Sequence, residues 1–217
     1  RHAGALVFRG SEQDVLDRYW RAAAWLGAGA IVRVTSDCPL IDPALCGDVI
    51  ETFHRTGADM VCNDLLPVWP HGLGCEVFSR QWLDRAAREA AVPADREHVS
   101  LYILEHPEAR VIGLLGPYDP AARHRWTLDR ESDYRLLKEV FARLPSGPAG
   151  WSHRAALAVV AADPDALTRV CRGADAIVNA VNPPYTAWPT RWPPIAHALL
   201  TAAEATDWQM FRVETRG

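Results

Sequence analysis

Short β-branched runs alternate with helix-length amphipathic segments along most of the chain, and this alternation limits the possible folds more than any other feature. Strand composition is found at 30–37, 59–63, 74–79 and 109–115. Between these runs, apolar residues recur at helical spacing. The pattern predicts an α/β domain with a mainly parallel sheet. In such sheets ligands bind beyond the carboxyl ends of the strands, so residues that follow each run are the first candidates for a site.

Capping residues predict where several helices begin. Ser11, with Asp14 three residues later, indicates a helix start. Asp42 and Pro43 supply a cap and a first-turn proline for a helix that ends near His54. Further helices are expected at about 80–91, 95–106 (capped by Asp95), 131–144 and 195–205, with two short ones after Trp151. Further short strands are expected at 125–129, 173–181 and 208–213.

Composition excludes several classes of protein. The 217 residues carry a net charge of −4 and the pI is about 6.1, which argues against a broad nucleic-acid footprint. No apolar run is long enough to span a membrane. The five cysteines have no C-x-x-C spacing, which favours buried thiols. With no recognisable signal peptide, we expect a cytoplasmic protein.

Two aspartates stand at strand ends. The strand within 30–37 is expected to end near Thr35, so Asp37 lies just past its end, and Asp129 ends the short run RWTLD. Carboxylates from two strand ends could converge on Mg²⁺, which usually takes one or two carboxylates plus substrate phosphates. The alternative is that Asp37 caps a turn and Asp129 caps the helix at 131–144, where Asp133 would be ordinary helix surface. Asp42 is better explained as a helix cap.

Other polar residues are weaker candidates for substrate binding. Arg9, Gly10 and Ser11 precede a helix whose N-terminal N–H groups could face an anion or a base, although capping alone explains Ser11. Arg96 and His98 could hold a substrate carboxylate, or could belong to a surface ion-pair network with Glu97. Serine-hydrolase, P-loop and H-E-x-x-H motifs do not occur in the chain.

Five segments occur together in an order and spacing that resemble one enzyme family. They are VFRGSEQDVLDRYWRAA, IVRVTSDCPLIDP, PHGLGCEVFS, ADREHVSLYI and RWTLDRESDYRLLKEVF. The family is that of the cytidylyltransferases related to the spore-coat polysaccharide protein SpsF, which are relatives of the acylneuraminate and KDO cytidylyltransferases. The resemblance covers about residues 5 to 171.

The resemblance implies a nucleotide-diphospho-sugar transferase fold, which is a Rossmann-like three-layer sandwich. It also implies transfer of a cytidylyl group from CTP to an acidic or activated sugar in surface-polysaccharide biosynthesis, with Mg²⁺ bound by Asp37 and Asp129. Arg9, Gly10 and Ser11 would lie near the nucleotide. The sugar side would be lined by four residues: His71, Glu76, Arg96 and His98.

Three departures from the family pattern qualify this expectation. The chain starts after the strand and the Gly-, Arg- and Lys-rich loop that hold CTP in the family, which predicts an N-terminally truncated domain and leaves retained activity open. His71 replaces a usual arginine, and Gly74 replaces a usual aspartate. Residues 172–217 instead resemble a strand-loop-helix fragment of NAD-dependent epimerases and short-chain dehydrogenases. We therefore expect a cytidylyltransferase-like domain at 1–171 and this fragment at 172–217.

Two alternative functions remain. The chain could be a non-catalytic module that binds sugar nucleotides, or part of an NAD(P)-dependent sugar epimerase or reductase. The sheet edge left open by the truncation could also promote a homo-oligomer.

Overall fold

The computed structural model describes residues 6–116, 124–144, 152–162, 177–179 and 210–212. These residues fall into two compact units, Arg1–Trp126 and Thr127–Gly217. The boundary predicted near residue 171 lies outside the described residues and stays a prediction.

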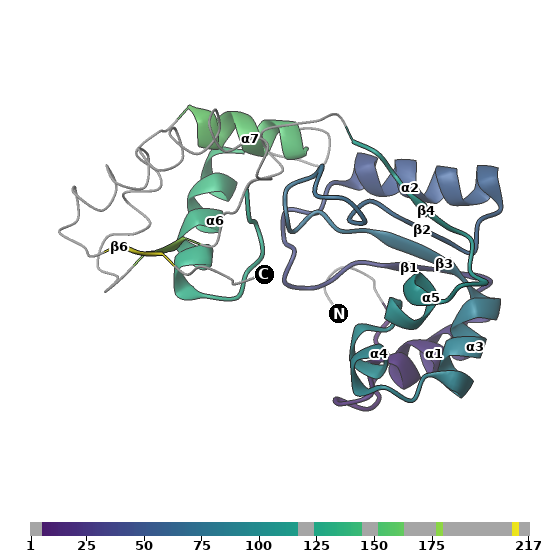
Figure 1. The fold of residues 1–217 in the computed structure, drawn as a ribbon. Coiled ribbons are helices and arrows are strands. Elements are labelled where there is room, and N and C mark those ends of the chain that lie inside the picture. Colours follow the sequence, from purple (N-terminus) through teal and green to yellow (C-terminus); the bar gives the residue numbers. More distant parts are fainter. Residues whose placement is uncertain (1–5, 117–123, 145–151, 163–176, 180–209, 213–217) are drawn as a thin grey trace. The chain divides into compact units, whose positions relative to one another are not determined.

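A four-stranded sheet forms the centre of the first unit, with the strand order β1-β3-β2-β4 (Figure 1). The strands are β1 (Ala30–Arg33), β2 (Met60–Cys62), β3 (Glu76–Ser79) and β4 (Val111–Gly113). β3 is antiparallel to both β1 and β2, whereas β2 and β4 are parallel. The prediction of a mainly parallel sheet was therefore wrong. No helix separates β2 from β3, so β3 can return antiparallel beside β2.

Helices cover both faces of this sheet, which gives the three layers that the family resemblance implied (Figure 1). α2 (Pro43–Thr56) packs on one face through Val49 and Phe53, against Val61 and Val77 of the strands. The opposite face is covered by four helices: α1 (Val15–Leu26), α3 (Arg80–Glu89), α4 (Pro93–His98) and α5 (Leu101–Glu105).

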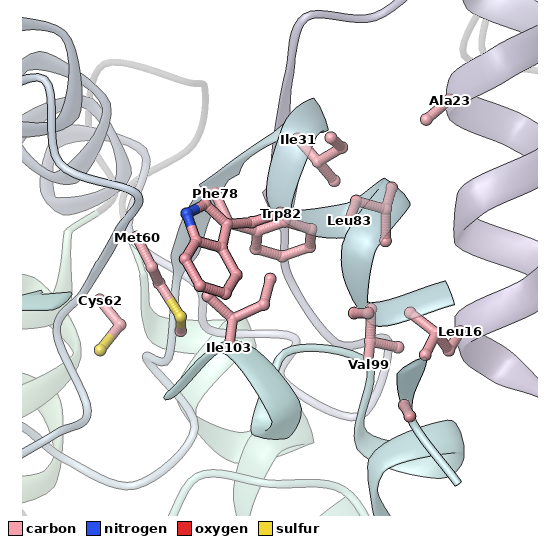
Figure 2. Close-up of a cluster of buried hydrophobic side chains, with 12 residues drawn as sticks. Leu16, Ala23, Ile31, Met60, Cys62, Phe78, Trp82, Leu83, Val99 and Ile103 are labelled. Atoms are coloured by element: carbon pink, nitrogen blue, oxygen red, sulfur yellow. The ribbon is translucent and has the colours of Figure 1, made fainter. Parts of the chain in front are cut away.

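A cluster of buried side chains joins that opposite face to its helices (Figure 2). Phe78 on β3 and Met60 on β2 come from the sheet, and Trp82, Leu83 and Ile103 come from the helices. Phe78 is completely buried. Since burying a large apolar side chain contributes about 1.5–3 kcal/mol, this cluster is a principal source of stability for the first unit.

Two predicted helix boundaries were wrong. α1 begins at Val15, not near Ser11, because Asp14 is its cap and accepts a hydrogen bond from the Asp17 N–H at 2.9 Å. The helix expected at 95–106 is divided into α4 and α5 by Val99, whose φ of 63° and ψ of −62° form a γ-turn. In it the Ser100 N–H donates to the His98 carbonyl at 2.6 Å.

In the second unit the structure describes α6 (Glu131–Arg143), α7 (His153–Ala161), β5 (Ile177–Asn179) and β6 (Met210–Arg212). β5 and β6 pair in parallel, with Val178 opposite Phe211. The short strand expected at 125–129 is only an isolated bridge between Arg125 and His71. The helix predicted at 195–205 lies outside the described residues.

Candidate active site at the carboxyl end of the first strand

Asp37 lies half-buried in the loop that follows β1. A hydrogen bond from the Thr35 side chain holds the pKa of the Asp37 carboxyl below its usual value, against the opposing effect of burial. The Cys38 thiol, whose sulfur lies 3.8 Å from Oδ1, and the nearby His71 act in the same direction. Asp37 is therefore a carboxylate at neutral pH, as a ligand for a hard cation must be.

The backbone of His71 is held by the segment before α6. Its N–H donates to the His124 carbonyl at 2.9 Å, and its carbonyl accepts from the Trp126 N–H at 2.7 Å. Trp126 is almost completely buried, whereas the His71 side chain is exposed. His71 is near enough to Asp37 for its charge to act on the carboxyl, although the sequence assigned the two residues to separate parts of the site.

Glu76 belongs to a buried charge cluster that the sequence analysis missed. Both of its carboxylate oxygens accept hydrogen bonds from Arg33 Nη1 at 3.1 Å, and Oε2 accepts from the Ser100 hydroxyl at 2.6 Å. The Glu76 and Arg33 side chains are only 13% and 16% exposed. Burial raises the pKa of Glu76, although Arg33 and Ser100 oppose the shift. The signal in the sequence was an arginine within the otherwise apolar run AIVRV.

Asp64 is a second carboxylate that the sequence analysis missed. It comes directly after Asn63 at the carboxyl end of β2, the same kind of position that Asp37 has after β1. A Cβ atom on Gly74 would lie 3.1 Å from Oδ2 of Asp64. The Asp64 carboxylate therefore borders the space that a side chain at residue 74 would enter.

Arg96 connects three helices. Its Nη2 and Nε donate to Asp14 Oδ2 at 2.5 and 3.0 Å, and its Nη1 donates to the carbonyls of Ala87 and Ala90. The same Asp14 caps α1 through its other carboxylate oxygen. The partner of Arg96 is thus Asp14, not Glu97, and its guanidinium is occupied by contacts within the protein. Its predicted role in substrate binding stays a prediction.

Substituting Arg96 by alanine is expected to lower the free energy of unfolding by about 1–2 kcal/mol, because a partly exposed charged hydrogen-bond network is lost. Urea unfolding would measure this change in the free energy of unfolding, with Arg88→Ala on the exposed side of α3 as the control. Equal stability of the two variants would contradict the structural role. A KM effect for the sugar without a stability effect would support substrate binding.

The remaining predicted residues of this unit lie on its surface. Arg9 and Gly10 are exposed, and His98 is exposed on α4. Ser11 accepts hydrogen bonds at two atoms, from the Asp14 N–H at 2.9 Å and from Arg18 Nη1 at 2.6 Å. These contacts order the chain just before α1 and do not identify a ligand.

Asp129 belongs to the second unit and is exposed. Its Oδ2 accepts from the Thr127 hydroxyl at 2.9 Å. The cap of α6 is provided by Asp133, whose carboxylate accepts from the N–H groups of Asp129 and Arg130 at 3.0 and 2.9 Å. The assignment of Asp133 as ordinary helix surface was therefore wrong. Convergence of Asp129 and Asp37 on one ion stays a prediction.

Among the residues that the structure describes, no group of three or more His, Cys, Asp or Glu side chains could hold a metal ion by itself. Mg²⁺ bound through one or two carboxylates and the phosphates of a nucleotide does not need such a group. The ionised, half-exposed Asp37 fits that mode of binding. In the same residues, no helix is long and apolar enough to cross a membrane.

Comparison with known proteins gives two curated relatives. The chain is 35% identical over 139 residues to the uncharacterized protein MJ1063 of Methanocaldococcus jannaschii, covering 63% of this chain and 56% of that protein. It is 31% identical over 148 residues to the spore coat polysaccharide biosynthesis protein SpsF of Bacillus subtilis, covering 67% and 60%. The chain therefore spans less than two thirds of either relative. No protein-family model matches it.

A solved structure shares the fold. It is a cytidylyltransferase from Leptospira borgpetersenii serovar Hardjo-bovis, with a TM-score of 0.70 and 28% sequence identity. The similarity covers 75% of this chain and 68% of that one.

Proposed function

We propose, on the premise that this chain is related to the SpsF-like cytidylyltransferases in sequence and in fold, that it transfers a cytidylyl group from CTP to a sugar. A sugar hydroxyl oxygen would form a bond to the α-phosphorus while the bond to pyrophosphate breaks. The products would be a CMP-sugar and pyrophosphate, for use in surface-polysaccharide biosynthesis.

The observation that carries the proposal is the ionised carboxylate of Asp37 at the carboxyl end of β1. Asp37 and Asp129 are the residues that would hold Mg²⁺. When bound with CTP, the ion would offset the negative charge of the phosphates. Thr35 and Cys38 keep the Asp37 carboxylate oriented and ionised through their hydrogen bonds. Its position after a strand fits the general location of ligands in α/β sheets.

The sugar side of the proposed site includes His71 and Glu76. The exposed imidazole of His71 lies near Asp37 and can donate a hydrogen bond to a sugar or phosphate oxygen. Glu76 is buried against Arg33 and Ser100, so its carboxylate is already occupied by contacts within the protein. Arg9, Gly10 and Ser11 are proposed for the nucleotide side, and Arg96 and His98 for the sugar side.

Titration calorimetry of CTP with Mg²⁺ into the purified chain, repeated with EDTA, tests the proposal. We expect binding that is lost on removal of the metal, because the carboxylate contacts CTP phosphates only through the ion. A screen of acidic and neutral sugars for pyrophosphate release would then identify the acceptor. Binding without release would favour a non-catalytic sugar-nucleotide module. No CTP binding by a chain that is folded by circular dichroism would contradict the proposal.

A further inference from the structure

The turn between α4 and α5 has a backbone conformation that its central residue does not favour. Val99 has a φ of 63° and a ψ of −62°, which is the rare and strained form of the γ-turn. Among the residues that the structure describes, Val99 is the one non-glycine residue with a positive φ. A β-branched side chain makes that conformation especially unfavourable. Such a conformation persists only where surrounding contacts hold it, and it is often found at functional sites.

Buried contacts hold this turn in place. The Val99 side chain is completely buried and belongs to the apolar cluster between the sheet and its helices (Figure 2). Ser100 is only 4% exposed. Its N–H donates to the His98 carbonyl at 2.6 Å, and its hydroxyl donates to Glu76 Oε2, also at 2.6 Å. The hydroxyl oxygen lies 3.3 Å from the same His98 carbonyl. Ser100 therefore joins the two ends of the turn to β3.

The strand register places this attachment at the edge of the sheet where ligands are expected to bind. Glu76 is the first residue of β3, and it pairs with Arg33 and Cys62, the last residues of β1 and β2. Both of these strands therefore end beside Glu76, at the edge from which the Asp37 loop leaves β1. The turn, which begins with the exposed residue His98, is thus anchored at this edge.

We propose that Ser100 is a positioning residue: by bonding to Glu76 and to the His98 backbone, it holds the strained turn that presents the His98 imidazole to the sugar. This inference rests on the proposed function, in which His98 binds the sugar. Ser100 itself would not contact the substrate, since it is buried. A backbone that is already rigid at His98 reduces the motion that sugar binding must remove. The buried pair of Arg33 and Glu76 then has a role besides stability, because it anchors the turn.

Steady-state kinetics of serine variants test this assignment. Ser100→Ala should raise the KM for the sugar by roughly 10- to 100-fold with a much smaller change in kcat, since misplacing a group by about 1 Å can cost about 100-fold. The affinity for CTP with Mg²⁺ should not change, because Asp37 lies on a different loop. Ser100→Thr keeps the hydroxyl and should restore the KM. Ser79→Ala is the matched control and should leave the KM unchanged, since Ser79 caps α3 at the opposite end of β3 by accepting from the Trp82 N–H at 3.3 Å.

The double variant with Ser100→Ala and His98→Ala separates positioning from a general loss of stability. If Ser100 acts through His98, the double variant should have a KM for the sugar no higher than that of His98→Ala alone. Additive effects of the two substitutions on the KM would overturn the proposal. So would a KM for Ser100→Ala that equals the KM for Ser79→Ala.

Hydrogen exchange followed by mass spectrometry tests the turn without any turnover. In Ser100→Ala the amides of residues 98–101 should exchange at least about tenfold faster than in the original chain, because a hydrogen bond to a charged group is lost. Ser79→Ala should leave these amides unchanged. Exchange in Ser100→Ala that is no faster than in the original chain would overturn the proposal. If the original chain shows no turnover with any sugar, the proposed function fails, and the exchange result alone then decides whether Ser100 holds the turn.

Discussion

Substituting Arg33 by methionine is expected to lower the free energy of unfolding by about 3–5 kcal/mol, because the Glu76 carboxylate would stay buried without its counter-charge. Methionine keeps the length and apolar stem of the side chain, so the loss of packing is small. The hydrogen bond from Ser100 to Glu76 would remain. Urea unfolding followed by far-ultraviolet circular dichroism measures the change.

Two variants make this result specific. Arg21→Met removes a surface ion pair with Asp17 and should cost less than about 1 kcal/mol, since the Arg21 side chain is 60% exposed. Adding Glu76→Gln to Arg33→Met should recover much of the loss by removing the uncompensated charge. If Arg33→Met lowers the free energy of unfolding no more than Arg21→Met does, Glu76 is adequately solvated without Arg33. The buried pair is then not needed for stability.

The same pair predicts how the effect of Arg33→Met depends on pH. Burial raises the pKa of Glu76 above its ordinary value of 4.5, and removing Arg33 should raise it further. A raised pKa in the folded state favours the folded protein in acid, and that contribution is lost as the pH rises through the folded pKa. The difference in stability between Arg33→Met and the original chain should therefore be larger at pH 7 than below pH 4.5.

Substituting Asp37 by asparagine is expected to reduce cytidylyl transfer by about 100- to 1,000-fold, the usual effect of losing one group that stabilises charge in a transition state. Asparagine keeps an acceptor for Thr35, so the fold should be retained. Because the pKa of Asp37 lies below its ordinary value of 3.8, its ionisation should not limit activity at any pH above that value. Turnover measured by pyrophosphate release, at several Mg²⁺ concentrations, tests the expectation.

Asp48→Asn is the control for charge, since Asp48 is exposed on α2 and does not belong to the proposed site. It should leave turnover unchanged. If Asp37→Asn is as active as Asp48→Asn, Asp37 does not hold the metal and the proposed site must be sought elsewhere.

The sequence predicted those features of the fold that depend on short segments. Asp42 and Pro43 begin α2 as expected, because a cap and a first-turn proline act within four residues. The three layers were implied by the resemblance to the family, whereas the alternation of strands and helices predicted only an α/β domain. The resemblance to the SpsF-like cytidylyltransferases and the nucleotide-diphospho-sugar transferase fold are both confirmed by the similarity to SpsF and to the Leptospira enzyme.

The features that were missed depend on residues far apart in the chain. Arg33 and Glu76 are 43 positions apart, and only the register of β1 with β3 places them together. The break at Val99 was missed because a β-branched residue with positive φ has no local preference for that conformation. Burial of the Val99 side chain and the bond from Ser100 to Glu76 hold it there. Tertiary contacts decide both features.

The Asn63 side chain closes the base of the loop between β2 and β3 by bonding to Leu73 and Cys75. Beyond this closure, residues 64–67 are exposed. Closing a longer loop costs little additional entropy, roughly 0.6 kcal/mol for each doubling of its length. Evolution can therefore lengthen or shorten the chain at 64–67 while the register of β2 with β3 stays the same. The loop between β2 and β3 can thus vary in length among relatives that share one sheet.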